Sequence, residues 1–304
     1  MSTKSTPTKL LAVLSLSMML AACGQAGTAE KNDALAGQTP SNAASGSNQS
    51  GEANPSGQSA EPTQADQAAI EQYHKFVISQ TDQFVKETDA FVKAVKAGDL
   101  ETAKKLYAPT RMYFERIEPI AESLGDFDPW IDAREGDVPD NEWRGFHRLE
   151  KALWVDKSTE GMDKVADQLL QDVKQLRVKV EHAEIDTQML VTGAVELLNE
   201  VSSSKVTGEE ERYSHTDLYD FAANVEGAKE IYLVLKPTLE KKDAALAKEI
   251  DTRFAELDQS LAPYRKGTDF VLYTELKPEE TKKLSQTIDA LAEPLSKIGT
   301  VLEG

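Results

Sequence analysis

The sequence contains a single cysteine, Cys23, among its 304 residues. One thiol excludes an intrachain disulfide framework, a cysteine-rich zinc site and an iron–sulfur cluster held by this chain alone. Basic residues are also few, with 34 Lys and Arg against 52 Asp and Glu, so the formal net charge is −18. A field of this sign repels nucleic-acid phosphates and anionic lipid surfaces and attracts cations. Nucleic acid is therefore excluded as the main partner.

The N-terminal residues are typical of a bacterial export signal. Two lysines precede an apolar stretch, Leu10–Leu20, that is too short to span a bilayer. The following tetrapeptide, Leu20-Ala21-Ala22-Cys23, resembles a lipobox, in which the chain is cut before a cysteine that then carries lipid. We predict a lipoprotein signal peptide over residues 1–22, lipidation of Cys23 and an extracytoplasmic protein anchored to the cell membrane. The alternative is an ordinary secretory signal with an incidental cysteine.

Residues 23–65 lack aromatic side chains, histidine and methionine. Gly, Ser, Asn, Gln and Ala dominate this stretch, and such a composition buries too little apolar surface to offset the entropy lost on ordering. We therefore predict a disordered tether here, which after Cys23 lacks the side chains of a soft-metal site. The folded unit is predicted over residues 66–304.

The remainder of the chain has the spacing of amphipathic helices. Apolar residues recur every seven positions from Ile70 to Phe91, which indicates a long helix that ends at Gly98. Asp99 is placed to cap the next helix, in which Pro109 and Pro119 predict kinks. Further helical patterns cover residues 142–154, 165–180, 189–201, 218–232 and 284–298.

Only one short run, Phe270–Tyr273, has the composition of a strand. The predicted fold class is therefore all-α, as an up-and-down bundle or a pair of bundles.

Acidic residues and one histidine form the candidate site. Glu115 and Glu118 lie three residues apart and share one face of a helix, and His147 and Glu150 have the same spacing. Imidazole and carboxylates on facing helices form a site for iron, zinc, copper or manganese. Asp132, in the acidic loop between the two pairs, is placed to reach the same site. The alternatives are a solvated acidic face at the first pair and a surface ion pair with arginine at the second.

Three longer segments are distinctive, namely RMYFERIEPIAESLGDFDPWIDARE (111–135), WRGFHRLEKALW (143–154) and RYSHTDLYDFAANVEGAKEIY (212–232). Together they resemble the imelysin-type domain of the bacterial EfeO/EfeM iron-uptake lipoproteins. The resemblance covers residues 66–304 and implies two four-helix bundles that arose by duplication. It also implies that the G-x-H-x-x-E motif, here Gly145, His147 and Glu150, lies beside a metal site.

The resemblance assigns further residues to that metal site. The other acidic site residues of the family correspond to Glu115, Glu118 and Asp132 in this sequence. His215 and Asp217, in the SHTDL stretch, are weaker candidates, and we expect Asp217 to cap the following helix instead.

The function implied by the resemblance is capture of ferric or ferrous iron outside the cell. The cargo passes to a membrane iron permease, with a haem peroxidase of the same uptake system as a second partner. Zn²⁺ and Cu²⁺ are expected to bind in vitro, because mixed carboxylate and imidazole ligands accept them as well. The longer EfeO proteins carry a cupredoxin domain where this chain has its tether, so this chain corresponds to the shorter, EfeM-like form.

Proteolysis is not expected, although the family is classified among peptidases. A zinc protease of the H-E-x-x-H type needs a glutamate and a second histidine where this chain has Arg148 and Lys151. Two alternatives to iron capture come from other functional classes. One is a lipoprotein that binds acidic polysaccharide through a bridging metal. The other is a structural or adhesive bundle without a ligand, which predicts that the four candidate side chains of the two helical pairs point apart.

Overall fold

A computed structural model describes residues 64–303 of the chain. The predicted signal peptide, Cys23 and all but the last two residues of the predicted tether lie outside the described residues. The first helix, α1 (Gln64–Lys96), buries most of the predicted stripe, including Val77, Phe84 and Phe91. It ends before Gly98, which has a positive φ, and the carboxylate of Asp99 accepts a hydrogen bond from the Thr102 amide at the start of α2.

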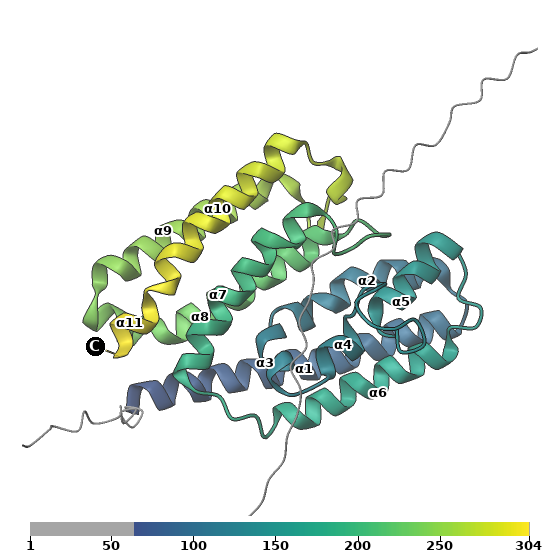
Figure 1. Ribbon diagram of the computed structural model, residues 1–304, viewed down its shortest axis with the longest axis horizontal. Coiled ribbons are helices and arrows are strands. Elements are labelled where there is room, and N and C mark those ends of the chain that lie inside the picture. Colours follow the sequence, from purple (N-terminus) through teal and green to yellow (C-terminus); the bar gives the residue numbers. More distant parts are fainter. Residues whose placement is uncertain (1–63, 304) are drawn as a thin grey trace, which may run out of the picture. The chain divides into compact units, whose positions relative to one another are not determined.

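Three long helices and several short ones form the first bundle. The long helices are α1, α2 (Leu100–Glu115) and α6 (Asp163–Val180), and α1 packs against both of the others. The short elements between α2 and α6 are α3 (Glu118–Ser123), α4 (Phe127–Ile131), α5 (Phe146–Lys151) and the π-helical turn η1 (Ala152–Asp156). Figure 1 shows these short elements beside α2 and α6.

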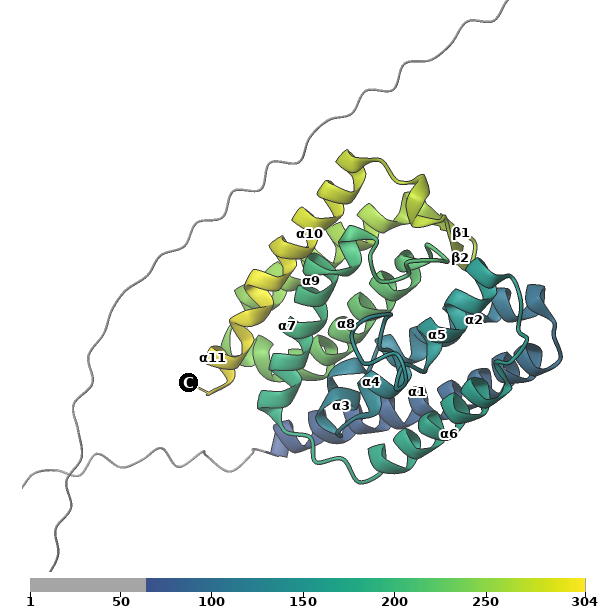
Figure 2. The ribbon, with the colours of Figure 1, turned by 45° about the vertical axis from the view of Figure 1, so that its right-hand side comes forward.

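The second bundle consists of four long helices, coloured from green to yellow in Figure 2. They are α7 (Thr187–Ser203), α8 (Asp217–Lys242), α9 (Ala244–Leu261) and α10 (Pro278–Ser296), followed by the short α11 (Ile298–Glu303). Helix α8 also packs against α1 and α2, so the apolar side chains of both bundles form one continuous core. Gly227 permits this approach, because a Cβ there would lie 2.4 Å from the carbonyl oxygen of Arg116.

Short elements complete the second bundle. They are η2 (Lys205–Thr207), η3 (Ala262–Tyr264), the antiparallel two-residue strands β1 (Arg265–Lys266) and β2 (Asp269–Phe270), and η4 (Tyr273–Glu275). The all-α prediction is confirmed, and the candidate strand contributes only Phe270 to this pair. Pro119 does not kink a continuous helix but lies in the first turn of α3, where its missing N–H costs no hydrogen bond. Among residues 64–303, no helix is long and apolar enough to cross a membrane.

Candidate metal centre

A glycine brings the two halves of the candidate site together. Gly145 has φ +90°, and a Cβ at this position would lie 2.3 Å from the carbonyl oxygen of Ile131. Only glycine permits this contact between the residue that precedes α5 and the end of α4. The contact places Asp132, the residue after α4, beside His147 in the first turn of α5.

One nitrogen of the His147 ring is held by Glu150. Nδ1 lies 3.1 Å from Oε2 of Glu150, one turn along the chain, so Nδ1 carries the hydrogen and donates it. The other carboxylate oxygen of Glu150 accepts hydrogen bonds from the backbone amides of Tyr213 and Ser214, at 2.9 and 2.7 Å. Both oxygens of Glu150 are therefore engaged, and this residue orients the imidazole.

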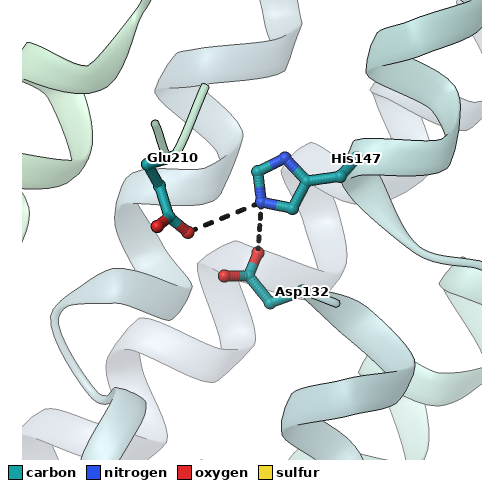
Figure 3. A group of neighbouring side chains, drawn as sticks. All are labelled: Asp132, His147 and Glu210. Atoms are coloured by element: carbon teal, nitrogen blue, oxygen red, sulfur yellow. Dashed lines mark ion pairs between the residues drawn. The ribbon is translucent and has the colours of Figure 1, made fainter. Parts of the chain in front are cut away.

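The other ring nitrogen faces two carboxylates. Nε2 of His147 lies 3.7 Å from Oδ1 of Asp132 and 3.6 Å from Oε1 of Glu210. Figure 3 shows the two carboxylates on either side of this nitrogen. It has no hydrogen-bond partner among the described residues, and Asp132, His147 and Glu210 are 7 %, 1 % and 3 % exposed. Ligand atoms around one ion at about 2.1 Å lie roughly 3.0 to 3.4 Å apart. A small movement of these three side chains would therefore coordinate a cation.

The electrostatic surroundings favour positive charge at His147. Burial and the Arg111 guanidinium lower the pKa of His147, but interactions with Glu150, Glu210 and Asp132 outweigh both and raise it to about 9. The ring is therefore protonated at neutral pH, and a cation that binds Nε2 displaces a proton.

Glu115 and Glu118 lie in a neighbouring cluster around a buried lysine. The ammonium group of Lys205, from η2, forms ion pairs with both carboxylates, and Asn224 of α8 donates a hydrogen bond to Oε2 of each. Glu115 and Glu118 are 0 % and 4 % exposed, so the solvated acidic face considered for them is wrong. Both glutamates lie close to the His147 cluster, but their carboxylates already form ion pairs with Lys205 and, for Glu115, with Arg111. Glu118 also lies in a group with Asp128 and Asp132 whose oxygens are within 4.8 Å of one another.

Arg111 connects the two clusters. Its guanidinium is fully buried and forms ion pairs with Asp132, with Glu115 at 2.5 Å and with Glu211 at 2.6 Å. Asp220 lies 3.4 Å from the same guanidinium, and neither of its carboxylate oxygens has a hydrogen-bond partner among the described residues. Because the carboxylates outnumber these fixed cations, the interior retains an excess of acidic groups around His147.

Several residues of this interior are not predicted from the sequence, among them Arg111, Lys205, Glu210, Glu211 and Asp220. The two glutamates belong to the run Glu209–Glu211, and such charge runs are usually solvated. The connection between α7 and α8 turns them inward instead, and Arg134 pairs with Glu210 at 2.8 Å from the partly exposed side. The sequence offers one indication that these glutamates belong to the site, namely that they lie just before the SHTDL segment.

His215 and Asp217 do not reach Nε2 of His147. His215 is half-buried and has a left-handed φ of +58°. Asp217 is the first residue of α8, and its Oδ1 accepts a hydrogen bond from the Glu211 amide at 3.1 Å. The N-cap position belongs to Thr216, so the predicted capping role of Asp217 is wrong. Asp217 holds the glutamate run in place instead.

The fold and this buried interior define a class: a double helical bundle with a histidine and carboxylate cluster between its halves. The Imelysin profile of peptidase family M75 matches residues 69–298. A relative in Staphylococcus haemolyticus, named Efem/EfeO family lipoprotein, is 43% identical over 305 residues, 99% of this chain and all of that protein. The chain belongs to the imelysin family and, within it, to the Efem/EfeO lipoproteins.

A second relative agrees with this assignment, and one solved structure shares the fold. An Efem/EfeO family lipoprotein of Staphylococcus aureus strain NCTC 8325 is 44% identical over 241 residues, which cover 77% of this chain and 85% of the relative. The crystal structure of a protein described as an iron-regulated protein A precursor, from Parabacteroides distasonis, superposes with a TM-score of 0.61 at 15% identity. The match covers 80% of this chain and 96% of that one, and it shows a shared fold.

Proposed function

We propose that this protein captures iron, ferric or ferrous, outside the cell and holds it at Nε2 of His147 with carboxylate oxygens of Asp132 and Glu210. The observation that carries the proposal is the buried Nε2, which lies between two carboxylates without a hydrogen-bond partner among the described residues. Glu150 holds the opposite ring nitrogen, as carboxylates commonly do behind a ligating histidine.

Iron is preferred as the cargo on the strength of the family. The relatives are named as Efem/EfeO lipoproteins, and the sequence resembles iron-uptake proteins of that kind. Oxygen and imidazole ligands suit iron but also accept zinc and copper, and the general affinity order favours Cu²⁺ in vitro. The family, rather than the ligand chemistry, is therefore the ground for proposing iron.

Location and partners complete the proposal. Lipidation of Cys23 would anchor the protein to the outer face of the cell membrane, and the tether would let the helical domain reach a membrane iron permease. A haem peroxidase of the same uptake system is the second proposed partner. The captured ion would pass from the His147 cluster to the permease.

We infer a binding role rather than proteolysis from the neighbours of His147. Arg148 lies over the ring of Trp143 at 5.4 Å, and Lys151 pairs with Glu135. Neither side chain supplies a second zinc ligand or a general base. The ligand-free bundle is not favoured, because the side chains of Glu115, Glu118, His147 and Glu150 converge on a buried interior.

Calorimetric titration of the mature chain tests the proposal, with Cys23→Ser to prevent lipidation. We expect Fe(III)-citrate or Fe(II) to bind with a Kd of about 1 μM or tighter. His147→Gln should weaken binding at least about 100-fold, because it removes the nitrogen ligand. His182→Gln, at an exposed position, is the matched control and should bind as wild type does. Absence of binding by the wild-type chain would refute the capture mechanism.

A second pair of variants distinguishes the two neighbouring clusters. Glu210→Gln should weaken metal binding at least about 30-fold, because a neutral amide oxygen replaces a charged ligand. Glu118→Gln should change the Kd by less than about threefold, because Lys205 and Asn224 already engage that carboxylate. The reverse order of effects in the same titration would move the metal to the Glu115 and Glu118 cluster.

A further inference from the structure

The candidate metal centre is closed in the structure, which raises the question of how a cation enters and leaves. The three proposed ligands are at most 7 % exposed, so an ion cannot reach Nε2 of His147 unless a neighbouring segment moves. This inference rests on the proposed function, since it concerns traffic through that site.

Two of the segments around the site are anchored by apolar side chains. Phe146, in α5 beside His147, stacks between Phe84 and Phe91 and is fully buried. Ile131, which precedes Asp132, is also fully buried. Moving either segment would expose apolar surface, which is costly.

The connection between α7 and α8, residues 204–216, has no such anchor. Its buried residues are Lys205, Glu210, Glu211 and Ser214, and every one of them is polar. Its only regular structure is the three-residue turn η2. Segments with few buried apolar contacts are among those that open locally. This connection is held by ion pairs and hydrogen bonds rather than by apolar packing, and it carries the proposed ligand Glu210.

One tyrosine holds this connection at both ends. Tyr273, in η4 of the second bundle, donates a hydrogen bond from its hydroxyl to the carbonyl of Val206. Its backbone amide donates to the carbonyl of His215 at 2.8 Å. Its ring lies against Gly208, where a Cβ would be 2.7 Å from Cδ1 of the ring. The tyrosine itself is 8 % exposed and fixed in the core.

We propose that residues 204–216 form the gate of the metal site and that Tyr273 is a positioning residue that helps to keep the gate closed. In the closed state Tyr273 holds Glu210 against His147. When the gate opens, Glu210 leaves with the segment, the cation loses one of its three ligands, and Asp132 and His147 become accessible. Capture and release of the ion would use the same movement in opposite directions.

Tyr273→Phe tests the gate because it removes the hydroxyl and keeps the ring against Gly208. Stopped-flow mixing with Fe(II), and with a chelator for release, should show association and dissociation both about tenfold faster. The Kd should change by less than about threefold, because the closed site keeps all its ligands. Tyr232→Phe is the matched control. Its hydroxyl also donates to a backbone carbonyl, that of Ala247 at 2.8 Å, and its other hydroxyl partner is Asp251 at 2.9 Å, outside residues 204–216.

Hydrogen exchange of the metal-free protein provides a readout that does not depend on iron. Amides of residues 204–216 should exchange about tenfold faster in Tyr273→Phe, while amides of α8 remain as in wild type. Gly208→Ala is a second variant with the same expected direction, because its methyl group displaces the ring.

The outcomes separate the two proposals. A wild-type chain that binds no metal refutes the proposed function, whatever hydrogen exchange shows. A chain that binds iron but exchanges it at the same rate in Tyr273→Phe and Tyr232→Phe overturns the gate alone. Faster exchange of α8 to the same degree as residues 204–216 also overturns it, because the tyrosine would then stabilise the whole fold.

Discussion

Replacing Lys205 with methionine is expected to destabilise the folded protein by about 3 to 5 kcal/mol at pH 7. Lys205 is fully buried, and its ammonium contacts Glu115, Glu118 and, at 3.4 Å, Glu200. Methionine has a similar volume, so packing changes little. The loss comes from the two buried carboxylates, which keep their desolvation cost and lose their counter-charge. Urea unfolding monitored by circular dichroism measures the difference.

The effect of Lys205→Met should depend on pH. Burial raises the pKa of Glu118 well above its ordinary value even with Lys205 in place, and loss of the ammonium raises it further. A carboxyl group whose pKa is higher in the folded state than in the unfolded state favours folding at low pH, and this contribution is lost as pH rises. The loss of stability in the variant should therefore shrink as the pH falls from 7 toward the ordinary pKa of glutamate, 4.5.

A surface lysine provides the control for Lys205. Lys229 pairs with Asp258 at 2.8 Å, and both side chains are more than a third exposed. Lys229→Met should cost no more than about 1 kcal/mol, because solvent screens the pair. Adding Glu115→Gln and Glu118→Gln to Lys205→Met should recover at least about half of the loss. If the triple variant is as unstable as Lys205→Met, unpaired charge is not the cause.

The fold was largely predictable because most helices carry their own signal. These signals can be recognised without knowledge of the tertiary structure. They are the seven-residue spacing of α1, the cap at Asp99 and the apolar stripes of α6, α7 and α10. The predicted patterns omit α9, although Leu246, Ile250 and Phe254 follow helical spacing and are buried there. The apolar stripe of α9 is narrow, and the many charged residues around it make the helical pattern difficult to recognise in the sequence.

The candidate site was only half predictable. His147 and Glu150 lie one turn apart, so their proximity follows from local helix geometry. Glu210 lies 63 positions after His147, in an acidic run, and nothing local indicates that the run turns inward. A buried lysine is equally unexpected from sequence, because lysine is almost never fully buried without a partner. The partners of Lys205 are Glu115 and Glu118. The spacing of these two glutamates suggested metal ligands, but in the structure they form ion pairs with the lysine.

Gly145→Ala is expected to cost about 3 kcal/mol or more of unfolding free energy and to weaken metal binding about tenfold. A methyl group would lie 2.3 Å from the Ile131 carbonyl oxygen and 2.9 Å from that of Trp130, so the backbone must move. Because Asp132 follows Ile131 and His147 lies two residues beyond Gly145, the movement separates two proposed ligands. Denaturant unfolding and calorimetry of the same variant measure the two effects.

Gly136→Ala separates the crowding at Gly145 from its backbone conformation. Gly136 has a similar φ, +97° against +90°, but a Cβ there would meet no atom within 4 Å. Gly136→Ala should lower the free energy of unfolding only by the strain of a positive φ, about 1 to 2 kcal/mol, and should leave metal affinity unchanged. Equal losses of stability in both variants would show that φ alone requires glycine at position 145. A stable Gly145→Ala chain with wild-type affinity would mean that the contact between α4 and α5 does not set the distance between Asp132 and His147.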